Sequence, residues 1–158
     1  MLYTIGYAGK SIEDFLICLQ KYKINYIIDI RSIPYSKYYT MYNKENIEEI
    51  LRQNYINYLY LGEEFGAKRE NDLDVYKPLI DYQGNKIQIL SYMHVYKRDS
   101  FKEGVRTIFS LLKNSNNNIC FMCGEKDPFN CHRSFMVAQY FYKKKIDCLH
   151  IIDIEHHI

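Results

Sequence analysis

Short apolar runs alternate along this chain with segments in which apolar side chains recur every three or four positions. The runs have the length and composition of buried or half-buried strands, and they lie at residues 2–6, 26–30, 56–61, 119–123 and 148–152. Strands that alternate with helices are typical of a parallel sheet covered by helices. The pattern therefore predicts an α/β fold: one domain over residues 1–158, with a mainly parallel β-sheet of about five strands and helices packed on it.

Four segments between these strands have the spacing of amphipathic helices. They begin at Ser11, at Asn43, near Phe101 and at Cys131, the last one running to about Lys144. Asn130 is a good N-cap residue, so the three residues after it are expected in the first helical turn. Residues 62–99 carry glycines, a proline and many charges. They predict a long excursion with one or two helical turns.

The composition narrows the class of protein. A hydrophobic share of 47% and a charged share of 25% are those of an ordinary globular domain. A net charge of +2 lacks the strong basic patterning of nucleic-acid binders. No apolar stretch is long enough for a membrane span, and residues 1–6 do not resemble a signal peptide. The five cysteines are odd in number and irregularly spaced, so we expect a cytosolic protein without structural disulfides.

Three loops are selected as a candidate site, because ligands of parallel α/β sheets bind beyond the carboxyl ends of the strands. They are residues 6–11, 29–36 and 123–132. The third loop holds two thiols, a carboxylate and an imidazole, which are the groups of nucleophilic and acid–base catalysis. A thiol at a helix start has its thiolate favoured. We therefore expect Cys131 to be more reactive than Cys18, Cys120 and Cys148, with Cys123 intermediate.

Arginines at the same edge suggest an anion site. Arg133 follows the third loop and Arg31 the second, and a guanidinium group suits phosphate or carboxylate. Two structural alternatives remain open: Arg31 as the partner that a buried Asp29 needs, and Arg133 paired with Glu125 or Asp127. The substrate-binding candidates are Arg31, Ser32, Arg133, Gly6 and Tyr7.

Two other kinds of site are weighed against this one. The first loop resembles the end of a phosphate-binding P-loop, but Thr4 stands where that pattern needs glycine. Cys120 and Cys123 form a CxxC pair, yet residues three apart on a strand face opposite sides. Cys123, Cys131, His132 and His150 form another set without the spacing of a zinc knuckle. We therefore expect neither a metal nor another cofactor.

Three segments resemble a known family in their order along the chain. They are Thr4-Ile5-Gly6-Tyr7, Asp29-Ile30-Arg31-Ser32-Ile33-Pro34, and the long stretch from Cys123 through Cys131-His132-Arg133. Together they are similar to domain-of-unknown-function family 488, although Tyr7 stands where histidine is more frequent. The resemblance implies an α/β fold and a small bacterial or archaeal cytosolic protein, with no established reaction.

The leading hypothesis is an enzyme that acts on an anionic, phosphorylated or nucleotide-like substrate at this edge of the sheet, as a cysteine-dependent transferase or hydrolase. Its catalytic candidates are Cys123, Glu125, Cys131, His132 and Asp29. The alternative is a nucleic-acid-binding module that uses the same basic rim, with phosphate contacts and aromatic stacking from Lys37, Lys68, Arg69, Lys97, Arg98, Tyr38, Tyr39 and Tyr96. A third alternative is a partner-binding protein with a large apolar surface patch.

Overall fold

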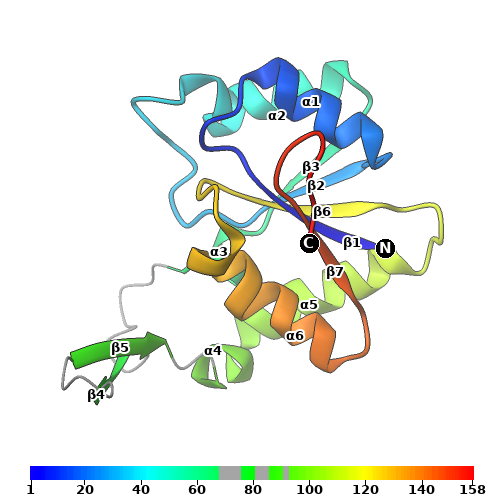
Figure 1. Cartoon of the computed structure of the whole chain (residues 1–158). Coiled ribbons are helices and arrows are strands. Elements are labelled where there is room, and N and C mark those ends of the chain that lie inside the picture. The colour runs from blue at the N-terminus through cyan, green and yellow to red at the C-terminus, as the bar shows by residue number, and fades with distance from the viewer. Residues whose placement is uncertain (68–75, 81–85, 91–92) are drawn as a thin grey trace.

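The computed structural model describes residues 1–67, 76–80, 86–90 and 93–158 (Figure 1). Five parallel strands form one sheet in the order β3-β2-β6-β1-β7. Their bounds are β1 Leu2–Gly6, β2 Tyr26–Asp29, β3 Asn57–Tyr60, β6 Ile119–Cys123 and β7 Cys148–Ile151. Each predicted strand is present, and no bound differs by more than one residue. The predicted α/β class is confirmed.

The register of the sheet brings the three selected loops to one edge. β6 lies between β1 and β2, and its last residue, Cys123, is paired with Gly6 at the end of β1. On the other side Met122 is paired with Asp29, the last residue of β2. Because these strands are parallel and end level with one another, the chain segments that follow them leave the sheet side by side.

Helices cover both faces of the sheet (Figure 1). One face carries α1 Ile12–Lys21, the 3₁₀ turn η1 Thr40–Tyr42 and α2 Lys44–Gln53, and the other carries α5 Asp99–Leu112 and α6 Gln139–Lys143. Each face has its own apolar core, and β6 contributes alternate residues to the two cores. Cys120 packs in one core and Cys123 in the other, so the two sulfurs of the CxxC pair do face opposite sides.

The predicted starts of the first two helices are confirmed. At α1 the Ser11 hydroxyl accepts the backbone N–H of Asp14 at 3.0 Å, which satisfies one of the free donors of the first turn. At α2 the Asn43 side chain makes no such bond. Its amide oxygen accepts instead from the backbone N–H of Ser36 at 2.7 Å and so closes the preceding loop.

The excursion contains more regular structure than the sequence predicts. The two short helices α3 Gly62–Phe65 and α4 Met93–Lys97 agree with the predicted helical turns. Two strands, β4 Tyr76–Ile80 and β5 Lys86–Leu90, pair antiparallel and were not predicted. Each is only five residues long, and β4 contains Pro78, a residue that argues against a strand when it is met in a sequence.

The last helix begins later than predicted. Pro128–Asn130 forms a 3₁₀ turn, η3, whose N-cap is Asp127, because the Asp127 carboxylate accepts the backbone N–H of Phe129 at 2.9 Å. Asn130 therefore ends this turn and does not cap the helix. Cys131 follows in extended conformation, and the helix opens with the π-helical turn η4 Arg133–Ala138 before α6. The placement of Cys131 inside the first helical turn is wrong.

Within the described part of the chain, helices are too short or too polar for any of them to cross a lipid bilayer.

Candidate functional site

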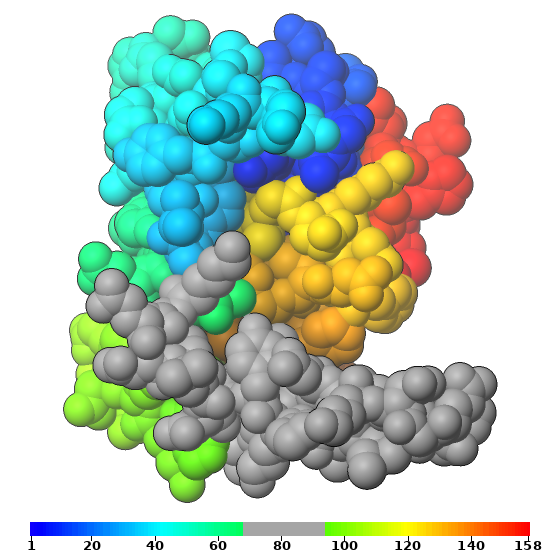
Figure 2. Space-filling view, turned by 90° about the vertical axis from the view of Figure 1, so that its left-hand side faces the viewer, coloured from blue at the N-terminus to red at the C-terminus, as the bar shows by residue number. Residues whose placement is uncertain are grey.

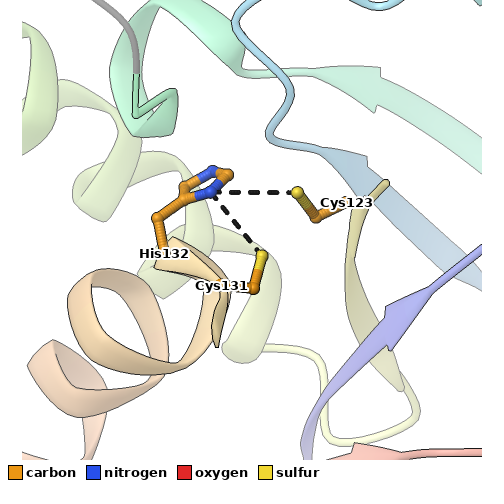
Figure 3. A group of neighbouring side chains, drawn as sticks. All are labelled: Cys123, Cys131 and His132. Atoms are coloured by element: carbon orange, nitrogen blue, oxygen red, sulfur yellow. Dashed lines mark hydrogen bonds between the residues drawn. The ribbon is translucent and has the colours of Figure 1, made fainter. Parts of the chain in front are cut away.

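Two thiols and an imidazole meet at the carboxyl edge of the sheet (Figure 3). Cys123 ends β6, and Cys131 and His132 stand at the start of the helical segment that returns over it. The Nδ1 atom of His132 lies 3.8 Å from the sulfur of Cys123 and 3.7 Å from that of Cys131. The three atoms all lie within 4.8 Å of one another. We call Cys123, Cys131 and His132 the thiol–imidazole cluster.

The ring of His132 is held by the neighbouring strand. Its Nε2 atom lies 3.0 Å from the backbone oxygen of Ile30, the residue that follows β2. A carbonyl oxygen only accepts hydrogen bonds, so Nε2 carries the hydrogen whenever the imidazole is neutral. The Nδ1 lone pair is then left facing the two sulfurs. The contact ties the loop after β2 to the cluster.

The surroundings shift the pKa values of the two thiols in opposite directions. The pKa of Cys123 is lowered from 9.0 to about 7, and the largest cause is a hydrogen bond from the Cys131 thiol. The backbone N–H groups of Glu125 and Gly124 and the charge of Arg133 also lower it, whereas burial raises it. The same bond to Cys123, together with burial, raises the pKa of Cys131 to about 12. Of the two thiols, Cys123 is therefore the one whose ionised form is favoured.

These pKa shifts favour Cys123 over Cys131, whereas sequence position favours Cys131; the order of reactivity stays a prediction. Cys131 lies before the helix, and its interaction with Cys123 together with burial raises its pKa, so its own thiolate is disfavoured. Burial likewise raises the pKa of Cys148 to about 12 and raises that of Cys120. Of the five cysteines, Cys123 has the environment of a reactive thiol.

Arg133 is a fully buried cation that has no carboxylate partner among the described residues. Its two terminal nitrogens donate to the backbone oxygens of Glu125 and Lys126, the second at 2.8 Å. Its Nε–H finds no partner in the described part of the chain. The proposed pairing with the carboxylates of Glu125 or Asp127 is not made, and no carboxylate of the described residues compensates this positive charge.

Gly6 explains how the loop after β6 can close over Arg133. A Cβ atom at this position would lie 1.8 Å from the backbone oxygen of Glu125 and 3.1 Å from a terminal nitrogen of Arg133. Only a residue without a side chain lets the two segments approach so closely. Gly6 is thus a packing residue of the site.

Arg31 and Asp29 form a buried ion pair, as the structural alternative held. The Nε–H of Arg31 donates to Asp29 Oδ1 at 2.9 Å and an Nη2–H donates to Oδ2 at 2.6 Å. Tyr58, on the adjacent strand β3, donates its hydroxyl to Asp29 Oδ2 at 2.7 Å. Asp29 is fully buried and Arg31 is 5% exposed. The position of Asp29 suits an anchor for Arg31 better than an acid or base.

Tyr7 packs between the loops. Its ring stacks on Tyr42 at 4.3 Å between centroids, and the guanidinium carbon of Arg31 lies 5.2 Å from the ring centre. Its hydroxyl accepts a hydrogen bond from Arg31 Nη1 at 3.3 Å. Because both arginines are buried and donate within the protein, their side chains do not form the open, two-arginine anion pocket expected from sequence.

The remaining candidate residues, Glu125, Ser32 and His150, make contacts outside the thiol–imidazole cluster. Glu125 is exposed, and its carboxylate accepts the backbone N–H of Asp127 at 3.2 Å. Ser32 lies against Gly66 at the start of the excursion. His150 is engaged with the hydroxyl of Thr4 at 2.7 Å through its Nδ1 atom, so it does not join the two thiols.

Two contributors to the site were missed from the sequence. One is the backbone oxygen of Ile30, which no side-chain pattern can reveal. The other is Tyr58, and here a signal existed. The apolar stretch of β3 lies beside β2 in a parallel sheet, and a hydroxyl within it needs a partner when it is buried.

The residues proposed for nucleic-acid stacking do not all lie at the surface. Tyr96 packs against Phe101 and Tyr140, and its hydroxyl donates to the backbone oxygen of Met136 at 2.9 Å. Tyr38 is 93% exposed. Lys68 and Arg69 lie outside the described residues.

Figure 2 shows the face on which the loop after β6 reaches the surface. The loop, in yellow, lies beside the light-blue segment that follows β2 and below the dark-blue segment near β1.

Comparison with known proteins gives one match. The model of a family described as a domain of unknown function, DUF488, matches residues 11–140. This range includes the loops after β2 and β6 and thus the whole cluster. No curated protein and no solved structure matches the chain significantly.

Proposed function

The chain belongs to the DUF488 family, and we propose that it is a cysteine-dependent enzyme with Cys123 as its nucleophile and a small anionic molecule as its substrate. The observation that carries the proposal is the contact set of the Cys123 sulfur. It lies at the carboxyl edge of a parallel sheet, beside an imidazole nitrogen and a second thiol, and within the electrostatic influence of a buried guanidinium group. A thiol so placed is activated in the way nucleophilic catalysis requires.

Each member of the cluster has a separate task in this proposal. Cys123 attacks the substrate as a thiolate and forms the covalent intermediate. Cys131 donates its S–H to that thiolate in the resting enzyme. His132, held by Ile30, takes up at Nδ1 the proton that Cys123 loses and donates it to the leaving group as the sulfur–substrate bond forms. A transferase passes the bound group to an acceptor, and a hydrolase passes it to water.

The charge of Arg133 supports an anionic substrate. A buried cation without a carboxylate partner produces a positive potential around it, and this potential is weakly screened inside the protein. Because the donors of Arg133 are directed at backbone oxygens, the residue acts through its field and not as a direct ligand. Phosphorylated compounds and nucleotides are among the anions that such a field favours.

The reduced cytosol is the setting that fits this chemistry. All five cysteines are free, and the proposed reaction needs two of them as thiols. In such a compartment thiols are kept reduced.

The proposal is tested by a turnover screen with phosphate esters, acyl phosphates and nucleotides, followed by intact-mass analysis for an adduct on Cys123. Cys123→Ser should lower turnover by a factor of about 10³ or more, because a serine hydroxyl is not ionised near neutral pH. Cys148→Ser, at a partly buried cysteine outside the cluster, is the matched control and should leave turnover unchanged. Turnover that survives in Cys123→Ser contradicts the proposal.

A further inference from the structure

We propose that the thiol–imidazole cluster is also a binding site for one thiophilic divalent cation, with Zn²⁺ held by the sulfurs of Cys123 and Cys131 and by Nδ1 of His132. This inference goes beyond the proposed enzymatic function and does not depend on it. Thiolate sulfur and imidazole nitrogen are the donors that Zn²⁺ prefers, whereas Mg²⁺ and Ca²⁺ prefer oxygen.

The spacing of the three donor atoms fits a tetrahedral ion. With zinc–sulfur bonds of about 2.3 Å and zinc–nitrogen bonds of about 2.0 Å, a tetrahedron has a sulfur–nitrogen edge of about 3.5 Å. The two observed distances are 3.8 Å for Cys123 and 3.7 Å for Cys131. Both sulfur–nitrogen distances are thus within a few tenths of an ångström of that edge, and the two sulfurs lie within 4.8 Å of each other, against a tetrahedral sulfur–sulfur edge of about 3.8 Å.

The orientation of His132 is that of a metal ligand. A ligating histidine usually donates its other ring N–H to a carboxylate or a backbone oxygen, which fixes both the tautomer and the ring plane. Here Nε2 lies 3.0 Å from the Ile30 oxygen. The contact presents the Nδ1 lone pair to the same space that the two sulfurs face (Figure 3).

The cluster supplies three donors, so a tetrahedral ion keeps one position for water or another small ligand. The two cysteines are buried, at 8% and 4% exposure, and belong to the apolar core of one face of the sheet. Low exposure limits competition by bulk water for the bound ion. The buried charge of Arg133 opposes cation binding, but two thiolates with one Zn²⁺ form a neutral unit.

Cation binding and thiol chemistry exclude each other at this site. A bound Zn²⁺ takes the sulfur lone pairs that Cys123 needs for nucleophilic attack. Loading the site releases the thiol protons to solvent, and no oxidant or reductant is required. The metal-loaded protein is then a protected form, and removal of the ion restores the reactive thiol.

The test is a titration of the full chain, reduced and stripped of metal with a chelator, first with Co²⁺ and then with Zn²⁺. We expect one Co²⁺ per chain, with thiolate-to-cobalt charge-transfer bands and the intense visible bands of a tetrahedral site, and displacement of Co²⁺ by Zn²⁺. Cys131→Ser and His132→Gln should each weaken Zn²⁺ binding by more than about 100-fold, since even loss of an outer hydrogen bond costs 10- to 100-fold. Cys148→Ser should bind like the unchanged protein.

A second measurement uses the unchanged protein and so does not depend on variants that fold. Saturating Zn²⁺ should slow alkylation of both Cys123 and Cys131 at least tenfold while leaving Cys148 unaffected. Absence of the cobalt bands, or equal alkylation with and without Zn²⁺, overturns the inference. Reactive Cys123 without Zn²⁺ binding leaves the enzymatic proposal standing alone. Zn²⁺ binding with an unreactive Cys123 in the metal-free protein supports the metal site and overturns the enzymatic proposal.

Discussion

Single residues at the sheet edge are constrained by close approach of the backbone, and Gly6 shows this most directly. In Gly6→Ala the new methyl group would lie 1.8 Å from the backbone oxygen of Glu125, which is an oxygen that cannot rotate away. We expect the variant to lose about 3 kcal/mol or more of unfolding free energy, at the upper end of overpacking costs.

Gly124→Ala is the matched control, because its nearest contact is the Tyr7 hydroxyl at 3.3 Å, the end of a side chain. We expect a cost below about 1 kcal/mol there. Urea denaturation measures both values. Equal costs would show that the loop after β6 does not pack on Gly6 as described.

The ion pair of Asp29 and Arg31 gives a second prediction for single residues. Asp29→Asn leaves a buried guanidinium group without its counter-charge, which should cost about 3–5 kcal/mol. Tyr58→Phe removes one hydrogen bond from the same carboxylate and should cost about 1 kcal/mol. Thermal and urea unfolding compare the two variants. A mild loss in Asp29→Asn would mean that this carboxyl is free for another role.

The chemistry of these residues was partly predictable from the sequence. Cys123, Cys131 and His132 were selected because parallel strands end at one edge, and the structure brings them together. The hydrogen-bond partners of Arg31 and Arg133 could not be predicted. The sequence around an arginine does not say whether its guanidinium group binds a ligand or oxygen atoms of the protein. The order of reactivity of Cys123 and Cys131 depends on which thiol donates to the other, and spacing does not determine this.

At the scale of elements, the strands were predictable because buried parallel strands are continuous apolar runs. The start of the last helix was not, because Asp127 and Asn130 are both good cap residues and the sequence does not say which one acts. The answer lies in two bonds that Asp127 accepts: one from the backbone N–H of Phe129, and the other from the Asn130 side-chain amide at 2.8 Å. The antiparallel pair β4–β5 was missed because its strands are short and β4 contains a proline.

The cap of α1 can be tested separately. Ser11→Ala removes the acceptor for the Asp14 N–H and should cost about 1 kcal/mol of unfolding free energy. Ser11→Asp keeps an acceptor at the N-cap and places a negative charge at the positive end of the helix dipole, so it should retain the stability. Chemical denaturation monitored by circular dichroism compares the two variants. If both lose the same amount, the side-chain cap does not stabilise α1.

For the whole molecule, Zn²⁺ binding should appear as added stability. A ligand that binds only the folded state stabilises it by about 2.7 kcal/mol at a free concentration 100 times its dissociation constant. In a domain of this size that corresponds to a rise in Tm of roughly 5–10 °C. Differential scanning fluorimetry of the reduced, metal-free protein measures the shift. His132→Gln should show little of it, and an equal shift in that variant would place the ion elsewhere.

The proposal as a whole depends on Cys123 being the reactive thiol of the folded, metal-free protein, and alkylation followed residue by residue with mass spectrometry tests this most directly. The pKa of Cys123 is lowered to about 7, whereas the pKa values of Cys131 and Cys148 are raised to about 12. The alkylation rate of Cys123 should therefore rise as the pH increases through about 7 and level off above pH 8, while the other two cysteines remain slow up to pH 9. Alkylation of Cys123 that is no faster than that of Cys148, or that appears only after unfolding, would contradict the account.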